Sequence, residues 1–142
     1  MCTSVPTSLP TSLNNNIFAS IDMCTNISNL LIVQIDPSTG HLLILDHSKK
    51  YVLLGLDFTP TISHASTRRA TSVLPKFQDI LLSRHVPSDH SRFVATLAIR
   101  EYANKSQFIN SIHEILGLHV DVLSGSDEAR LIYLGILQFT IT

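Results

Sequence analysis

The order of apolar patterns along the chain is the feature that most constrains its fold. Three short segments with strand character come first, and from residue 59 onward helical spacing alternates with two more strand-like segments. Strands joined by a tight turn pair antiparallel, whereas strands separated by a helix pair in parallel. The sequence therefore predicts an α/β domain with a mixed sheet in the order β-β-β-α-β-α-β-α. The predicted strands are residues 17–23, 30–35, 41–46, 92–96 and 118–123.

Local signals place helices between these strands. Thr59-Pro60 is typical of a helix start, and apolar residues recur at helical spacing from there to Ser83. Pro75 lies inside that range, where it removes a backbone N–H and predicts a kink. A second helix is expected to be capped by Asn104 and to end at Gly117.

The third predicted helix begins where the last strand ends and carries the clearest candidate for chemistry. Ser124-Gly-Ser-Asp127 has the spacing of a capping box, so the helix start is well specified. Glu128 follows in the first turn, where backbone N–H groups and the helix dipole stabilise a negative charge. An ionised carboxylate at the carboxyl edge of a sheet can act as a general base that activates water. The spacing alone also fits an acidic residue that only stabilises its helix.

Size and charge exclude several functions. A chain of 142 residues holds one core, and a net charge of -1 gives no electrostatic footprint for nucleic acid. No segment reaches the roughly 20 apolar residues of a membrane span. Residues 1–16 are expected to be a disordered Ser/Thr/Pro-rich leader before a domain over residues 17–142. Cys2 and Cys24 indicate reduced thiols in a cytoplasmic protein.

Three motifs in order narrow the fold further. They are Ile21-Asp-Met-Cys-Thr-Asn26, Val94-Ala-Thr-Leu-Ala-Ile-Arg-Glu101 and Leu123-Ser-Gly-Ser-Asp-Glu-Ala-Arg-Leu-Ile-Tyr-Leu-Gly135. With them, residues 18–138 resemble the N-terminal domain of the Ppx/GppA family of exopolyphosphatases and guanosine pentaphosphate phosphohydrolases. The resemblance implies a ribonuclease H-like fold, as in the actin, sugar kinase and heat-shock ATPase superfamily. It also implies a hydrolase that releases terminal phosphate from inorganic polyphosphate or guanosine pentaphosphate with the help of Mg²⁺.

The same resemblance assigns a role to individual residues. Glu128 matches the family's catalytic glutamate, which orients or deprotonates the attacking water. Arg100 matches an arginine that contacts polyphosphate in the family. The resemblance therefore implies that Arg100 is also a catalytic residue. Asp22 matches a carboxylate that places the metal or the water, and is the candidate metal ligand. Thr25 and Asn26 match the phosphate-facing turn, so the implied phosphate-binding residues are these two and Arg100.

Departures from the family pattern keep a second hypothesis open. Cys24 replaces a glycine of the phosphate turn, where a side chain at positive φ would cost about 1–2 kcal/mol. Ile27 replaces a serine, and Leu53 replaces an arginine. The chain stops at Thr142, where the family continues into a second phosphate loop. The alternative to the hydrolase is therefore a truncated, non-catalytic remnant that folds or binds without turnover.

The final apolar run, Leu131 to Ile141, suggests a further property. If the missing second lobe leaves it exposed, this run is a contiguous apolar surface of the kind that marks an interaction site. We therefore expect self-association through it.

Overall fold

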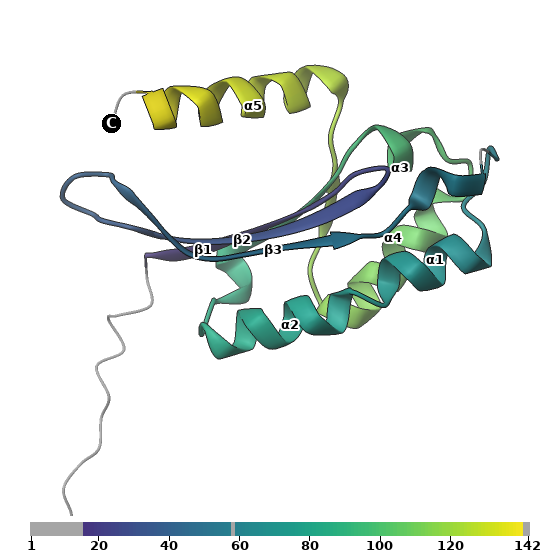
Figure 1. Ribbon diagram of the computed structural model, residues 1–142, viewed down its shortest axis with the longest axis horizontal. Coiled ribbons are helices and arrows are strands. Elements are labelled where there is room, and N and C mark those ends of the chain that lie inside the picture. The colour runs from purple at the N-terminus through teal and green to yellow at the C-terminus, as the bar shows by residue number, and fades with distance from the viewer. Residues whose placement is uncertain (1–15, 58, 141–142) are drawn as a thin grey trace, which may run out of the picture.

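A five-stranded mixed sheet lies at the centre of the protein, whose computed structural model describes residues 16–57 and 59–140 (Figure 1). The strand order is β3-β2-β1-β4-β5, with β1 antiparallel to β2, β2 antiparallel to β3, and β1, β4 and β5 parallel. This confirms the predicted mixed sheet and the ribonuclease H-like arrangement. The strands are β1 (Ile17–Met23), β2 (Ile27–Ile35), β3 (Leu42–Tyr51), β4 (Ser91–Ala95) and β5 (Val120–Val122). The predicted leader, except for Asn16, lies outside the described residues.

The alternation of side chains along β1 sets the two faces of the sheet. Ile17, Ala19, Ile21 and Met23 are buried against one face. Since successive side chains of a strand point to opposite faces, Asp22 projects from the other face. The apolar face therefore makes the core, and the opposite face is free to carry chemistry.

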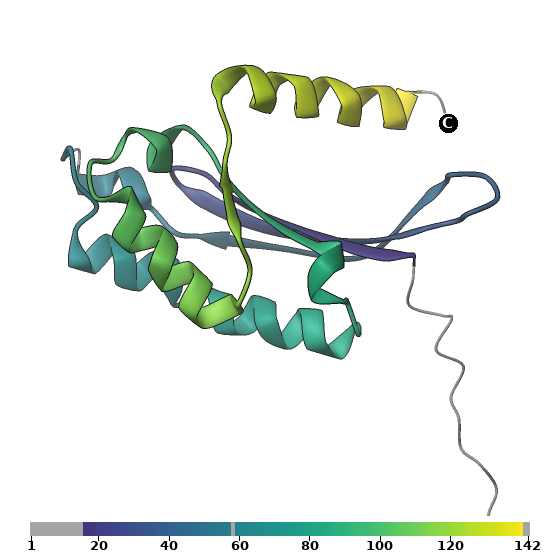
Figure 2. The same ribbon diagram turned by 180° about the vertical axis from the view of Figure 1, so that it is seen from behind.

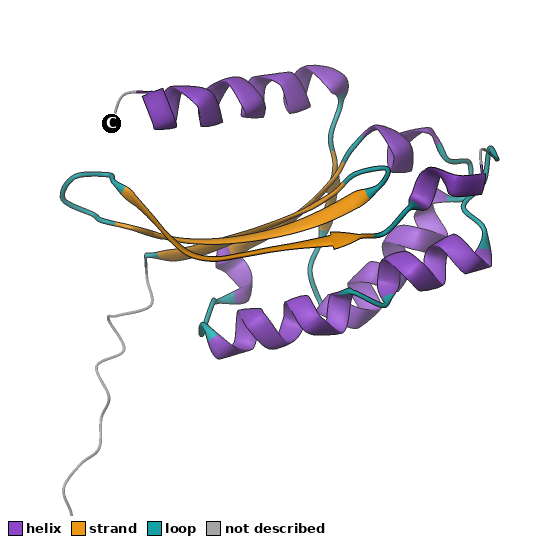
Figure 3. Cartoon of the chain, viewed as in Figure 1, coloured by secondary structure: helices purple, strands orange, loops and turns teal. Residues whose placement is uncertain are grey.

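Helices cover the apolar face, as Figures 1 and 3 show. They are α1 (His64–Thr71), α2 (Leu74–Ser83) and α4 (Lys105–Leu116). The longest helix, α5 (Gly125–Thr140), crosses the opposite face, which the view from behind also shows (Figure 2). Short helical turns complete the chain: η1 (Leu54–Asp57), η2 (Ser88–His90) and α3 (Leu97–Glu101).

The predicted helix from Thr59 to Ser83 is wrong in its start and in its continuity. The helix begins at His64, where the Ser63 hydroxyl accepts a hydrogen bond from the N–H of Ser66 at 3.1 Å. A break at residues 72–73 then separates α1 from α2, and Pro75 lies in the first turn of α2. In a first turn the missing N–H has no helical partner to lose, so proline starts a helix there rather than kinking one.

The later elements follow the sequence prediction more closely. α4 ends at Gly117, which adopts the left-handed conformation at φ 67°. Asn104 precedes α4, but its side chain does not cap that helix. It instead exchanges hydrogen bonds with the backbone N–H and C=O of Ile62, at 2.8 and 2.9 Å, and ties α4 to the segment before α1. Within the described residues, no helix is long and apolar enough to cross a membrane.

Candidate active site

The carboxyl ends of the three parallel strands meet at one edge of the sheet. Asp22 pairs with Val94 across β1 and β4, and Val94 pairs with Asp121 across β4 and β5. Beyond the strands the ladder continues, because the N–H of Leu123 donates to the carbonyl of Ala95 at 2.9 Å. Ligands of open α/β sheets bind outside this edge. The three sequence motifs therefore converge where a site is expected.

Glu128 reaches this edge because the last strand turns sharply into α5. The hydroxyl of Ser124 accepts the N–H of Asp127 at 3.1 Å and donates to its carboxylate at 2.7 Å. The N–H of Glu128 donates to the carbonyl of Ser124 at 3.0 Å, which closes the first helical turn. The predicted cap is thus confirmed, and it aims Glu128 across the sheet.

A pocket of about 300 Å³ lies between α5 and the sheet, and we call it the acidic pocket. Asp22 lines it from β1 and Glu128 lines it from α5. Leu131 and Ile132 of α5 form its apolar wall. The remaining lining residues are Ser20, Val94, Thr96 and Leu123. The structure therefore brings the two predicted carboxylates, Asp22 and Glu128, into one site.

Cys24 and its neighbours hold the Asp22 carboxylate. The Cys24 Sγ donates to the two carboxylate oxygens at 3.3 and 3.5 Å, and it is also hydrogen bonded to the Thr96 side chain. Asn29, which faces Asp22 in the β1–β2 register, gives the carboxylate a further side-chain hydrogen bond. Burial raises the pKa of the Cys24 thiol, with a smaller effect from the negative charge of Asp22. A raised pKa keeps the thiol protonated, so Cys24 serves as a donor and not as a nucleophile.

Cys24 causes no backbone strain in the turn. Among the described residues other than glycine, only Leu53 and His85 have positive φ. Any effect of Cys24 on the site therefore comes from its thiol, which lies beside the Asp22 carboxylate. Leu53 is the strained position, at φ 50°, and the Arg69 guanidinium holds its carbonyl at 3.0 Å.

The electrostatics of Asp22 favour its protonated form. Burial raises the pKa of its carboxyl above the ordinary 3.8, the charge of Glu128 raises it further, and the bonds from Cys24 and Asn29 oppose these effects only in part. Two neighbouring carboxylates whose environments differ are a common arrangement for acid–base chemistry.

Replacing Asp22 by asparagine is expected to stabilise the fold at neutral pH. A folded-state pKa above the unfolded one means that the folded protein binds more protons, so stability falls as pH rises from 3.8 through the raised pKa. The neutral amide avoids that loss, so the melting temperature of Asp22→Asn should exceed that of the parent at pH 7 but not below pH 3.8. Asp36 is a control of opposite sign, because bonds from Ser38 lower its pKa and Asp36→Asn should be destabilising at pH 7. If the melting temperatures of the parent and of Asp22→Asn change with pH in parallel from pH 3 to 8, the raised pKa of Asp22 is contradicted.

Arg100 lies beside the acidic pocket but is already engaged with the protein. Its Nη1 donates to the carbonyl of Leu123 at 2.5 Å, and its Nε donates to Glu101 at 3.4 Å. The first contact ties α3 to the turn that positions Glu128. Within the described part of the chain, these contacts leave the two N–H groups of Nη2 for a ligand.

Thr25 and Asn26 lie in the turn between β1 and β2. The carbonyl of Thr25 accepts the N–H of Gly55, and that of Asn26 accepts the N–H groups of Val52 and Leu53. A Cβ added at Gly55 would lie 2.5 Å from the Thr25 side chain, so this position needs glycine for close packing. Thr25 lines a neighbouring pocket of about 380 Å³ with Leu97 and Glu101, not the acidic pocket. Of the predicted site residues, Asp22 and Glu128 therefore line the acidic pocket and Thr25 lines this second pocket, whereas Arg100 and Asn26 line neither.

The acidic pocket could hold a hard cation only with help from a ligand. Mg²⁺ prefers oxygen donors and is usually bound by one or two carboxylates together with water and phosphate oxygens. Asp22 and Glu128 fit that donor set. Across residues 16–57 and 59–140, no three His, Cys, Asp or Glu side chains gather closely enough to hold a metal by themselves.

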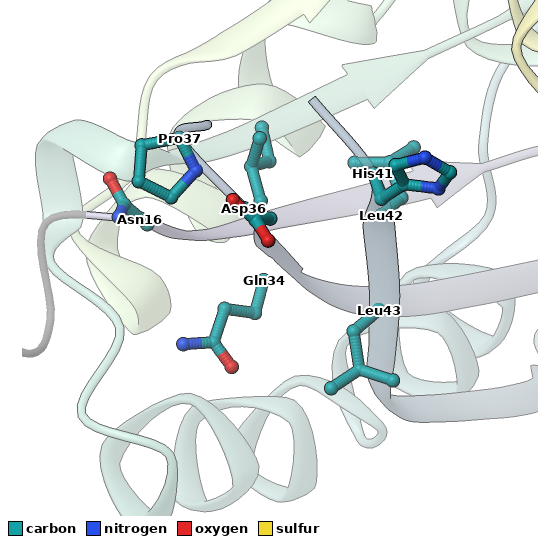
Figure 4. Close-up of a pocket in the computed structure, with 8 residues that line it drawn as sticks. Asn16, Gln34, Asp36, Pro37, His41, Leu42 and Leu43 are labelled. Atoms are coloured by element: carbon teal, nitrogen blue, oxygen red, sulfur yellow. The ribbon is translucent and has the colours of Figure 1, made fainter. Parts of the chain in front are cut away.

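A larger pocket, of about 570 Å³, lies at the β2–β3 hairpin (Figure 4). Gln34, Asp36 and His41 line it, but the Asp36 carboxylate is occupied by the N–H and hydroxyl of Ser38 at 2.8 and 2.6 Å. Besides Asp36, His41 is the titratable residue of its lining, so this pocket lacks the two carboxylates that meet in the acidic pocket. The smaller acidic pocket is therefore the better candidate.

Sequence reasoning did not single out Thr96 and Asn29. Thr96 stands in the second motif, four residues before Arg100, and its burial next to Cys24 is visible only in the fold. Asn29 becomes a neighbour of Asp22 through the register of β1 and β2. An isolated asparagine inside an apolar strand was the available signal, because burying an amide is costly without a partner.

Comparison with known proteins agrees with this geometry. An exopolyphosphatase from Cytophaga hutchinsonii is 32% identical, with a TM-score of 0.79, over 86% of this chain and 38% of that one. A Ppx/GppA family member from Aquifex aeolicus is 26% identical, with a TM-score of 0.78, over 87% of this chain and 40% of that one. The chain thus spans about two fifths of the length of these solved relatives. Residues 31–141 match the Ppx/GppA phosphatase family, and this chain therefore belongs to that family.

Proposed function

We propose that this chain acts as a hydrolase of the exopolyphosphatase type, which releases terminal phosphate from inorganic polyphosphate or guanosine pentaphosphate. The observation that carries the proposal is the meeting of Asp22 and Glu128 across one pocket at the carboxyl edge of the sheet. Family membership and the similarity to an exopolyphosphatase support the same chemistry.

Each residue has a defined part in the proposed reaction. Glu128 accepts a proton from water while the water oxygen bonds to the terminal phosphorus. The bond from that phosphorus to the bridging oxygen breaks, which yields orthophosphate and a chain shorter by one phosphate. Asp22 orients the water, and Arg100 contacts phosphate oxygens through Nη2. Asp22 would hold Mg²⁺ together with phosphate oxygens, and the cation would supply neutralisation of the phosphate charge.

The test is orthophosphate release from long-chain polyphosphate and, separately, from guanosine pentaphosphate. The chain should release phosphate with Mg²⁺ and lose that activity when the cation is chelated. Release from only one compound identifies the preferred substrate. No release from either compound, with the fold intact by circular dichroism, would reject the hydrolase for this chain alone.

A second candidate is a non-catalytic member of the family that binds polyphosphate without turnover. Two observations favour it: the thiol of Cys24 lies 3.3 Å from the Asp22 carboxylate, and two of the donors of Arg100 are engaged within the protein. Polyphosphate binding measured by calorimetry, in the absence of phosphate release, would support this candidate.

Cys24→Gly is expected to strengthen polyphosphate binding. Removal of the thiol opens space beside Asp22, and the gain should be about tenfold in affinity, the value of roughly one good hydrogen bond. The added backbone freedom should cost about 0.5–1 kcal/mol of stability. Cys24→Ser is the matched control, because it keeps a side chain of similar size. Equal affinities of the glycine and serine variants, measured by calorimetry, would show that the thiol does not obstruct the site.

A further inference from the structure

The β1–β2 turn at Thr25 and Asn26 is held from behind by the segment that follows β3. The carbonyl of Asn26 accepts the N–H groups of Val52 and Leu53 at 2.9 and 3.2 Å. The carbonyl of Thr25 accepts the N–H of Gly55 at 3.2 Å. Among the described residues, the N–H groups of Thr25 and Asn26 themselves have no backbone acceptor. Backbone N–H groups exposed in a turn are suited to an anion such as phosphate. The place of this turn therefore depends on the conformation of the segment behind it.

Leu53 is the strained residue of that segment. Its φ is 50°, in the left-handed region where the Cβ of a leucine crowds the neighbouring carbonyl oxygen. Such a conformation persists only where the surrounding contacts impose it. Nη2 of Arg69 donates to the Leu53 carbonyl at 3.0 Å and to the Ser66 hydroxyl at 2.7 Å. The guanidinium of Arg69 therefore holds Leu53 in its strained conformation.

Arg69 makes this contact at a cost in stability. It lies one turn after the fully buried Ser66 on α1, and its own side chain is partly buried. The Nε of Arg69 is buried and has no hydrogen-bond partner in the described part of the chain. A buried donor without a partner destabilises a fold. The arginine is therefore better explained by what its Nη2 holds in place than by the stability that it adds.

We infer that Arg69 is a positioning residue, which fixes the Thr25–Asn26 turn through Leu53 and thereby sets the affinity of that turn for phosphate. Arg69 lines neither the acidic pocket nor the neighbouring pocket at Thr25. It therefore acts through the backbone of Leu53 and not by contact with phosphate. The inference rests on the proposed function only in giving the turn to phosphate.

Amide hydrogen exchange of the full chain tests the inference without any ligand. Arg69→Met removes the donors and keeps a long side chain that favours a helix. The N–H groups of Val52, Leu53 and Gly55 should then exchange at least tenfold faster, because the bonds that protect them open more often. Arg68→Met is the matched control, since Arg68 is exposed on the same helix, and it should leave these rates unchanged. Equal rates in the parent and Arg69→Met would overturn the inference.

Two further variants test whether Leu53 is the link. Leu53→Gly in the Arg69→Met chain should restore slow exchange at Val52 and Gly55, because glycine adopts a positive φ without strain. Arg69→Lys should stay within about threefold of the parent rates, since an ammonium group still donates to the Leu53 carbonyl. The melting temperature of Arg69→Met should change by less than about 4 °C, because the lost bonds and the removed buried donor oppose each other. An Arg69→Met chain that does not fold, or a Leu53→Gly change that restores nothing, would overturn the inference.

Calorimetry with long-chain polyphosphate tests the effect on binding. The dissociation constant of Arg69→Met should rise about tenfold, whereas Arg68→Met, which removes the same charge, and Arg69→Lys should stay close to the parent. In turnover, Arg69→Met should raise KM and leave kcat unchanged, because the β5–α5 turn positions Glu128 independently. Faster exchange with an unchanged dissociation constant would overturn the effect on phosphate. A parent that binds no polyphosphate would instead refute the proposed function, and the exchange rates would still decide whether Arg69 fixes the turn.

Discussion

Replacing Glu128 by glutamine is expected to lower phosphate release from polyphosphate by about 10²–10⁴-fold, the contribution of a positioned general base. Glutamine keeps the size of the side chain and loses the ability to accept the proton of the attacking water. The binding of polyphosphate should change much less, since the role of Glu128 lies in the chemical step. Initial rates of orthophosphate release, measured at saturating polyphosphate, give this ratio directly.

The control for Glu128→Gln removes the same charge elsewhere. Glu114 is exposed on α4, on the other side of the sheet from α5. Glu114→Gln should keep the parent rate. A second effect identifies the pocket: without the negative charge of Glu128 the pKa of Asp22 should fall toward its ordinary value. If parent and Glu128→Gln release phosphate at the same rate, the activity comes from a contaminant or from another site.

The strand pattern was a good predictor because burial on one face controls it. The first strand was predicted with the bounds that the structure has, and its alternation of apolar and polar residues places Asp22 on the face opposite the core. The parallel pairing of β1, β4 and β5 followed from the helices between them. Topology then brings Asp22 and Glu128 together at one edge, although they lie far apart in the sequence.

The helix after residue 59 could not be predicted as well, because proline has two opposite meanings in a helix. Inside a helix Pro75 would be a kink, and in a first turn it is a favourable start. The buried side chains of Leu74, Phe77 and Leu81 fit either case. Only the cap at Ser63 and the break before Leu74 decide between them.

The partners of the site residues needed the three-dimensional register. The family resemblance assigned Thr25 and Asn26 to the phosphate turn, yet it could not show that their carbonyls hold the β3–η1 segment. It also could not show that Asn29 and Thr96 surround the group formed by Asp22 and Cys24. These contacts join residues of different strands, and no local pattern encodes them.

Arg100→Gln is expected to raise KM for polyphosphate about 10–100-fold, since a hydrogen bond to a charged group contributes roughly 1.5–3 kcal/mol. The rate at saturation should fall less, because the arginine contacts phosphate oxygens before and during the reaction. Steady-state kinetics at several salt concentrations measure this split, and the parent's KM should show the steeper dependence on salt. Arg92→Gln, at an exposed arginine on β4, is the charge-matched control and should leave KM unchanged.

A purely structural role of Arg100 predicts a different result. Loss of the hydrogen bond from Nη1 to the Leu123 carbonyl would loosen the turn before α5 and lower the melting temperature. Because that turn positions Glu128, kcat would fall as well. Arg100→Lys separates the two roles: a lysine restores the positive charge and part of the affinity for phosphate, but it cannot reproduce the planar contact of the guanidinium. Recovery of KM in Arg100→Lys, without recovery of the melting temperature, would therefore assign phosphate binding to the charge and the bracing of Leu123 to the guanidinium. An unchanged KM in Arg100→Gln would leave Arg100 with the structural role alone.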